Sequence, residues 1–170
     1  SGNRGECAQV CRLPYRLMKN DKYLTENRYL ISTKDLNTAN YFKDILDSSI
    51  YSLKIEGRMK SPEYVGCVTR LYRDLLDKYY SHEDLVVNEE YLNDLKVIFN
   101  RKYTKGFILN ENNADIVNTD TSNHLGVSLG RVIKWNRKYI YVELSRELHQ
   151  GDGIRFNEIN KGMIANFIYD

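Results

Sequence analysis

Long apolar runs are absent from this sequence: no stretch approaches the 18 or so apolar residues of a transmembrane helix. No apolar signal stretch opens the chain either. Cysteine is scarce, and its number, three, is odd, which argues against a closed disulfide framework. We therefore expect a reduced, cytoplasmic setting and no association with a membrane.

An excess of charge is also lacking, since the formal net charge is only +2. A nucleic-acid surface would therefore have to arise from local clusters of basic residues. The remaining composition, with 42% hydrophobic and 28% charged residues, is that of a globular chain. A length of 170 residues allows one ordinary domain or pieces of two.

The first half of the chain alternates predicted strands and helices. Tyr15–Lys19 and Arg28–Ile31 have the character of short strands, and the first of them ends in a polar turn. Apolar residues at helical spacing predict a helix over Asn37–Ser48, and the alternating segment Ile50–Ile55 predicts a strand. A second helix, capped by Ser61 and running to about residue 80, follows. This order is typical of an α/β domain with parallel strands.

The second half has a different character. A short helix is predicted over Glu89–Phe99, followed by an asparagine-rich excursion over residues 100–122. Short strands with turns between them then suggest a small antiparallel barrel. The predicted strands are Val127–Ile133, Tyr139–Glu143, Gly153–Phe156 and Met163–Ile168.

Two thiols, Cys7 and Cys11, lie in a basic loop that contains glycine. Thiolates at this spacing are candidate ligands of a soft metal or an iron–sulfur cluster, although a pair of free thiols or an adventitious disulfide fits the spacing too. Four thiolate ligands cannot come from this chain, because it has only one further cysteine, Cys67, which is expected to be a half-buried helix residue. We therefore expect a site shared with residues outside the chain.

A second constellation follows the predicted strand Ile50–Ile55. Lys54 and Glu56 would point to the same side of that strand, and in a parallel barrel they would lie at its catalytic end. We take Glu56 and Lys54 as candidate catalytic residues, and Arg58 and Lys60 as candidate ligands of an anionic substrate. The alternative is a structural ion pair that closes the end of the barrel.

Two further features have a structural and a functional interpretation. His124 precedes the predicted small barrel and is expected to be a hydrogen-bonding structural residue rather than a ligand or a base. The basic and aromatic stretch from Arg101 to Phe107 could contact RNA, but we favour a solvated loop with local anchors.

Five segments together resemble peptidase family U32, whose members are described as collagenase-like proteases. In order they read SGNRGECAQVCRLPY, LKIEGRMKSPEYV, FNRKYTKGF, NHLGVSLGRV and LHQGDGIRF. The resemblance covers essentially the whole chain. It implies that residues 1–80 are the C-terminal portion of a TIM-like (β/α) barrel, that 81–122 link it onward, and that 123–170 begin a small β-barrel similar to those of translation factors. The expected fold class is thus α/β plus β.

The resemblance also implies chemistry. Related proteins hydroxylate tRNA, rRNA or ubiquinone precursors with a 4Fe–4S cluster held by four cysteines, and those acting on RNA use prephenate as the hydroxyl source. Cys7 and Cys11 match two cysteines of the family, and the cluster is expected to assemble only in the full-length protein. An RNA hydroxylation enzyme is therefore the preferred function. The alternatives are an endopeptidase and a non-catalytic RNA-binding or scaffold module. Separately, the exposed strand edges of an incomplete barrel would favour a homodimer.

Overall fold

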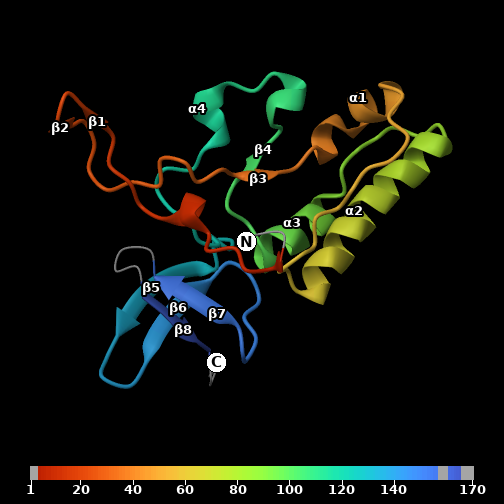
Figure 1. Cartoon of the computed structure of the whole chain (residues 1–170). Coiled ribbons are helices and arrows are strands. Elements are labelled where there is room, and N and C mark those ends of the chain that lie inside the picture. Colours follow the sequence, from red (N-terminus) through yellow and green to blue (C-terminus); the bar gives the residue numbers. More distant parts are fainter. Residues whose placement is uncertain (1–3, 157–160, 166–170) are drawn as a thin grey trace. The chain divides into compact units, whose positions relative to one another are not determined.

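The computed structural model describes residues 4–156 and 161–165, and the chain divides into two compact units, Ser1–Gly126 and Val127–Asp170 (Figure 1). No helix among the described residues is both long enough and apolar enough to cross a membrane.

The first unit begins with an antiparallel hairpin of β1 (Met18–Lys19) and β2 (Lys22–Tyr23). Its two turn residues, Asn20 and Asp21, have φ angles of 48° and 59°. Asparagine and aspartate tolerate this left-handed conformation better than most residues, and two such residues in a row match the twist of a tight hairpin. The predicted strand and turn are thus confirmed, although the strand is shorter than expected.

Two other predicted strands are wrong. Arg28–Ile31 is reduced to one isolated bridge, in which Arg28 pairs with Tyr15. Residues 50–57 have no regular secondary structure, and their apolar side chains are exposed. The physical reason is that a strand needs a neighbour for its backbone hydrogen bonds, and the described residues pair no strand with this segment.

The parallel pairing instead joins β3 (Asp35–Leu36) to β4 (Tyr103–Thr104), with Asp35 opposite Tyr103. Parallel neighbours need a long crossover, and here it is helical. The crossover contains η3 (Ala39–Tyr41), α1 (Phe42–Asp47), α2 (Pro62–Tyr80) and α3 (Glu89–Ile98). After β4 come η4 (Phe107–Leu109) and α4 (Asn113–Ile116), and η2 (Val10–Arg12) precedes β1.

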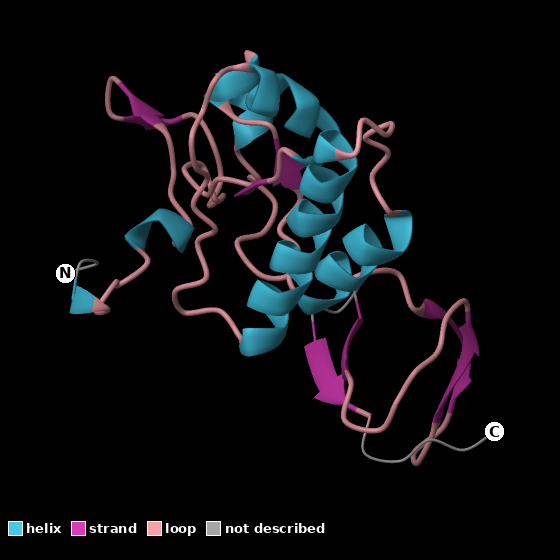
Figure 2. Cartoon of the chain, turned by 90° about the vertical axis from the view of Figure 1, so that its right-hand side faces the viewer, coloured by secondary structure: helices cyan, strands magenta, loops and turns pink. Residues whose placement is uncertain are grey.

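Both long helices begin where the sequence predicts. The Ser61 hydroxyl accepts a hydrogen bond from the Tyr64 N–H at 3.3 Å, and Pro62 occupies the first turn of α2. The Asn88 side-chain oxygen caps α3 by accepting hydrogen bonds from the backbone N–H groups of Glu90 and Tyr91. Figure 2 shows α2 and α3 side by side, and their apolar faces form the core together.

The core of the first unit lies where α2 meets α3, η3 and α1. Leu71 and Leu75 of α2 are completely buried. The buried cluster comprises Ala39, Phe42, Val68, Leu71, Leu75, Val87, Leu92 and Leu95. Residues 81–122 were expected to be a linker. They are part of the first unit, because α3 packs in its core and β4 pairs with β3.

The second unit contains two antiparallel hairpins. One pairs β5 (Gly130–Trp135) with β6 (Ile140–Leu144), and the other pairs β7 (Gly153–Phe156) with β8 (Lys161–Ile164). The four predicted strands are thus found, Gly153–Phe156 with its predicted bounds and the other three with shifted bounds, and the end of the last one lies outside the described residues. Over the described ranges the hairpins remain separate two-stranded sheets, and one parallel pair is present in the first unit. The TIM-like barrel and the closed small barrel therefore stay predictions.

We expect Leu71→Ala to lower the free energy of unfolding by about 2–5 kcal/mol, because it leaves a cavity in a fully buried position. Urea denaturation followed by helical circular dichroism measures this loss. Val65→Ala on the same helix removes a partly exposed side chain and should cost less than about 1 kcal/mol. Equal losses in the two variants would contradict this description of the core.

Candidate functional site

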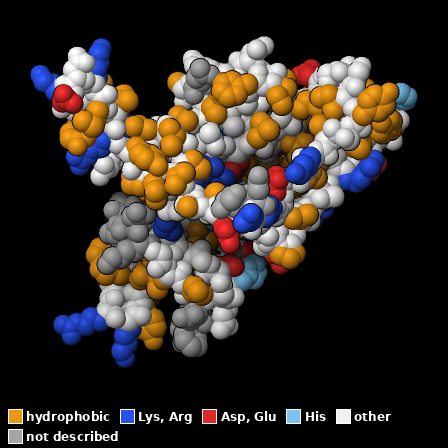
Figure 3. All heavy atoms as spheres, viewed as in Figure 1, with side chains coloured by type: hydrophobic (Ala, Val, Ile, Leu, Met, Phe, Trp, Pro, Cys, Tyr) orange, Lys and Arg blue, Asp and Glu red, His pale blue; other side chains and the backbone are white. Residues whose placement is uncertain are grey.

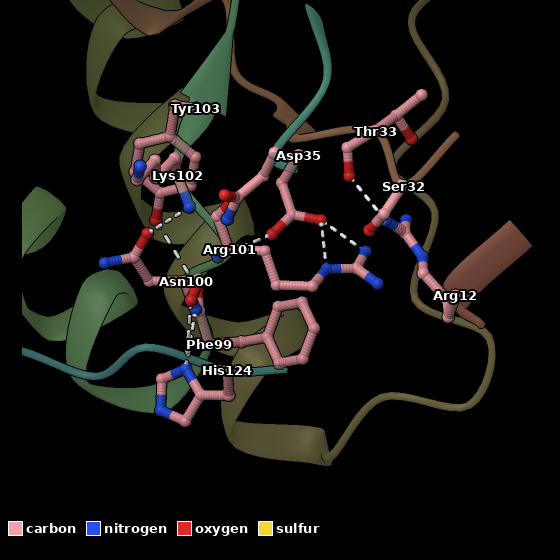
Figure 4. Close-up of polar contacts among 11 residues, drawn as sticks. Arg12, Ser32, Thr33, Asp35, Phe99, Asn100, Arg101, Lys102, Tyr103 and His124 are labelled. Atoms are coloured by element: carbon pink, nitrogen blue, oxygen red, sulfur yellow. Dashed lines mark hydrogen bonds and ion pairs between the residues drawn. The ribbon is translucent and has the colours of Figure 1, made fainter. Parts of the chain in front are cut away.

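A charged cluster, here called the Asp35 cluster, consists of Arg12, Asp35, Lys60 and Arg101. Its centre is the pair of Asp35 and Arg101, whose side chains are only 15% and 17% exposed. The Arg101 Nε donates to Asp35 Oδ1 at 3.0 Å, and the Arg101 backbone N–H donates to Oδ2 at 3.1 Å (Figure 4). Both carboxylate oxygens are therefore held by the segment that leads into β4, an arrangement stronger than a single ion pair.

Arg12 brings the N-terminal motif to the same place. Its Nη1 donates to the buried Ser32 hydroxyl at 2.7 Å and to the Thr33 carbonyl, just before β3. Figure 4 shows its guanidinium directed toward Ser32 and Thr33. Partial burial, and then repulsion from Arg101, lower the pKa of Arg12, although a guanidinium stays charged at any working pH.

Lys60 is the third cation of the cluster. A turn closed by the Lys60 N–H and the Gly57 carbonyl, 3.0 Å apart, positions it, with Met59 at a φ of 61° that favours glycine. The Lys60 ammonium lies 2.8 Å from the centroid of the Phe99 ring and 5.3 Å from that of Tyr64. Among the described residues no hydrogen-bond acceptor or carboxylate pairs with it directly.

The pKa of Lys60 is lowered to about 8. The main cause is burial, and repulsion by Arg101 and Arg12 adds to it, while the Asp35 carboxylate acts in the opposite direction. Burial also raises the pKa of the neighbouring Tyr64 phenol, which therefore remains neutral.

The Phe99 ring supports the cluster from below in Figure 4. The Arg101 guanidinium carbon lies 4.9 Å from its centroid, and the His124 ring is stacked on it at 5.7 Å with an interplanar angle of 9°. The His124 Nδ1 accepts from the Asn100 N–H at 2.9 Å, so Nε2 is the nitrogen that donates to the Val97 carbonyl at 3.1 Å. The expectation that His124 is a hydrogen-bonding structural residue is confirmed.

The two candidate ligands, Cys7 and Cys11, are both exposed free thiols. Gln9 adopts a left-handed conformation between them, and its backbone N–H donates to the Cys7 sulfur at 3.4 Å. Hydrogen bonds of this kind stabilise metal-bound thiolates. Cys67 lies apart from the loop on α2, half-buried against the core, as expected.

The two thiols therefore suit two ligand positions of an iron–sulfur cluster. Within residues 4–156 and 161–165, no group of three or more His, Cys, Asp or Glu side chains is arranged to hold a metal ion. The remaining thiolates of a four-cysteine set are not among the described residues.

Lys54 and Glu56 lie on an exposed loop rather than at the end of a strand. Their charged groups are 3.5 Å apart, and their side chains are 85% and 65% exposed. The Glu56 carboxylate accepts the Arg58 backbone N–H at 2.8 Å, and this bond, followed by attraction to Lys54, lowers the pKa of Glu56. The two residues thus form an exposed ion pair on a loop, whereas both interpretations of the sequence place them at the end of a barrel strand.

Arg58 connects this loop with the cysteine loop. A Cβ atom at Gly5 would lie 3.1 Å from the Arg58 guanidinium, so the two loops approach closely at Gly5. Of the four residues predicted for catalysis and substrate binding, Lys60 joins the Asp35 cluster, Arg58 lies beside the cysteine loop, and Lys54 and Glu56 face solvent.

The sequence reasoning missed Asp35 and Phe99. Asp35 has no local signal, because its partner Arg101 is 66 residues away in the chain. Phe99 and Arg101 both belong to the segment FNRKYTKGF, so the resemblance itself was the signal that could have identified them. Four of the five segments that carry the resemblance contribute to the first unit, and three supply members of the Asp35 cluster.

Comparison with known proteins agrees with these motifs. The model of peptidase family U32 matches residues 1–118. The chain belongs to this family. A collagenase of Porphyromonas gingivalis (strain ATCC BAA-308 / W83) is 32% identical over 163 residues, which cover 92% of this chain and 34% of the collagenase.

Other relatives of this U32 protein are named for RNA hydroxylation. The 23S rRNA 5-hydroxycytidine C2501 synthase of Escherichia coli (strain K12) is 31% identical over 175 residues, covering 98% of this chain and 26% of the synthase. The tRNA hydroxylation protein P1 of Bacillus subtilis (strain 168) is 37% identical over 113 residues, covering 62% and 27%. The chain thus spans about a third or less of the length of these relatives. No solved structure matches it.

The site predicts an unusual titration of Lys60. Its midpoint should lie near pH 8, measured from the side-chain NMR signals of labelled lysines, and Asp35→Asn should lower it further by removing an attractive charge. Between pH 8 and 10.5 the unfolded chain binds more protons at Lys60 than the folded protein does, so this residue makes stability rise with pH in that window.

Lys43 is the internal control for this measurement. Its hydrogen bond to Asp47 raises its pKa above the ordinary value of 10.5. A Lys60 midpoint as high as that of Lys43 would show that the ammonium is not in the environment described.

Proposed function

We propose that this chain is part of an enzyme that hydroxylates a base of tRNA or rRNA in the cytoplasm. The observation that carries the proposal is the Cys7–Cys11 loop, in which two exposed thiols and a backbone N–H bond to sulfur adjoin a cationic site. The relatives named for RNA hydroxylation support it, because one of them aligns with nearly the whole chain.

In this proposal Cys7 and Cys11 are two ligands of a 4Fe–4S cluster, and the other two thiolates come from outside the described residues. Such a cluster supplies one-electron chemistry when bound. The backbone N–H of Gln9 stabilises the Cys7 thiolate, and the cations at residues 12 and 58 offset negative charge nearby.

The residues of the KIEGR segment would handle an anionic co-substrate, and prephenate is the one that the family resemblance implies. Arg58 and Lys60 are the proposed ligands of that anion. Glu56, as a carboxylate, fixes the Arg58 backbone, and Lys54 balances its charge. A direct role of Glu56 and Lys54 in proton transfer remains part of the proposal, and it requires the substrate to cover this exposed loop.

The β5–β6 hairpin supports RNA as the substrate. One face carries Tyr139 and Tyr141, whose rings are 6.5 Å apart, and the Lys134 ammonium lies 4.2 Å from the Tyr141 ring. Residues 130–144 contain four basic residues and one acid. Figure 3 shows Lys and Arg side chains standing out from the second unit where Figure 1 draws the turn of this hairpin. Exposed aromatic rings with interleaved positive charge suit stacked bases and phosphates.

A peptidase is the second candidate, favoured by the 32% identity to the Porphyromonas gingivalis collagenase over 92% of the chain. In that case Glu56 is the residue to test, since its carboxylate is exposed to a substrate. Cleavage of collagen by the purified whole protein, abolished by Glu56→Ala, would support the peptidase in place of the hydroxylation enzyme.

Mass spectrometry of tRNA and rRNA tests the proposed reaction. A strain that lacks the whole protein should lose one hydroxylated nucleoside, and the wild-type gene should restore it. Cys7→Ser and Cys11→Ser should fail to restore it because each removes a cluster ligand, whereas Cys67→Ser should succeed. An unchanged set of nucleosides in the deletion strain would refute the reaction, and full rescue by both serine variants would refute the ligand assignment.

RNA binding by the 170-residue chain tests the hairpin. Tyr141→Ala should weaken the binding of single-stranded RNA about 5- to 160-fold, since one stacked base contributes about 1–3 kcal/mol. Fluorescence anisotropy at two salt concentrations measures this, and affinity should fall with salt. Tyr23→Ala, in the exposed hairpin of the first unit, is the matched control. Equal affinities of the two variants would exclude the hairpin as the RNA surface.

A further inference from the structure

We propose that the Asp35 cluster is a binding site for a small dianion, a dicarboxylate or a phosphate monoester, held by Arg12, Lys60 and Arg101. This proposal rests on the proposed function and deepens it, because it adds Arg12 and Arg101 to Lys60 as residues that would receive the anionic co-substrate. The test below needs neither an iron–sulfur cluster nor RNA.

The charges of the cluster are unbalanced. Three cations from three distant segments share the surroundings of one carboxylate, and burial, followed by repulsion from Arg101 and Arg12, lowers the pKa of Lys60. The flanking phenols of Tyr64 and Tyr103 have raised pKa values and stay neutral, so they cannot compensate. A group of partly buried like charges destabilises the free protein, and a dianion would neutralise the two positive charges that Asp35 leaves over.

The cations of the cluster also have unused hydrogen-bond donors. Asp35 engages the Nε and Nη2 atoms of Arg101, and Arg12 bonds to the chain through Nη1 alone. Within the described part of the chain, the other N–H groups of these guanidiniums and all three of the Lys60 ammonium have no acceptor. Guanidinium and ammonium groups donate to carboxylate and phosphate oxygens in strong, charge-assisted bonds.

Contacts within the protein hold these cations in position. Arg12 is tied to Ser32 and Thr33, and Arg101 to Asp35. The Lys60 ammonium lies over the Phe99 ring, and the His124 ring is stacked on Phe99. A site that is organised before the ligand arrives loses less entropy on binding.

Anion binding by the 170-residue chain is the test, with isothermal titration calorimetry as the measurement and malonate, phenyl phosphate, inorganic phosphate and acetate as probes. We expect the two organic dianions to bind at least tenfold more tightly than acetate. Lys60→Gln should weaken that binding about tenfold or more, as expected for the loss of a charge-assisted bond. Lys22→Gln, which removes the same charge from the exposed β2, should leave the affinity unchanged.

The pH dependence provides a second readout. Affinity should fall as pH rises through about 8, where Lys60 loses its proton, because Arg12 and Arg101 keep their charge and the two phenols stay neutral. In Lys60→Gln this fall should disappear. Lys60→Arg should retain dianion binding, since it preserves the charge, and should move the fall to higher pH.

The outcomes distinguish the possibilities. Preference for malonate identifies a dicarboxylate site, and preference for phenyl phosphate identifies a phosphate site. Equal affinity for acetate and malonate, or equal affinity in Lys60→Gln and Lys22→Gln with unchanged thermal stability, would overturn the proposal. If Lys60→Gln unfolds, Lys60→Arg decides, because loss of binding in that folded variant would also overturn it. Dianion binding without RNA hydroxylation in cells would refute the proposed reaction and leave the site intact.

Discussion

The ion pair between Asp35 and Arg101 is the interaction on which the first unit depends most. It joins β3 to the segment that enters β4, so it closes the helical crossover at the point where the only parallel pair of the described residues begins. It also places one negative charge among three positive ones. Without that carboxylate, repulsion among Arg12, Lys60 and Arg101 would act on the same few residues that bring the strands together.

The same pair explains why motifs that are far apart in this U32 sequence occur together. Arg12 belongs to the cysteine segment, Lys60 to the KIEGR segment and Arg101 to the FNRKY segment. A side chain that serves only local packing needs no partner in a distant segment, whereas these three cations share one electrostatic environment. The cysteine loop adjoins it through Arg12 and through the approach of Gly5 to Arg58. Redox ligands and anion ligands would thus come from neighbouring loops.

Local signals allowed much of the fold to be predicted. The helix capped by Ser61, the helix before residue 99 and the turn after Lys19 depend on residues close together in sequence, and all three are confirmed. The strand predicted over residues 50–55 is wrong. Alternating apolar residues such as Leu53 and Ile55 form a strand only when a neighbouring strand pairs with their backbone hydrogen-bonding groups. Most of the candidate site could not be predicted, since the Asp35 pairing depends on tertiary contacts. Cys7, Cys11 and Lys60 were identified only as separate candidates.

The long separation between β3 and β4 has a kinetic consequence. Asp35 and Arg101 are 66 positions apart, and they can meet only after the chain between them has been brought into a closed loop, a closure that has an entropic cost before the pair forms. The helices α2 and α3 can assemble earlier, because their contacts are nearer in sequence. The charged cluster is therefore expected to be among the last parts of the unit to assemble, and folding of the α2–α3 core would precede acquisition of any binding capacity.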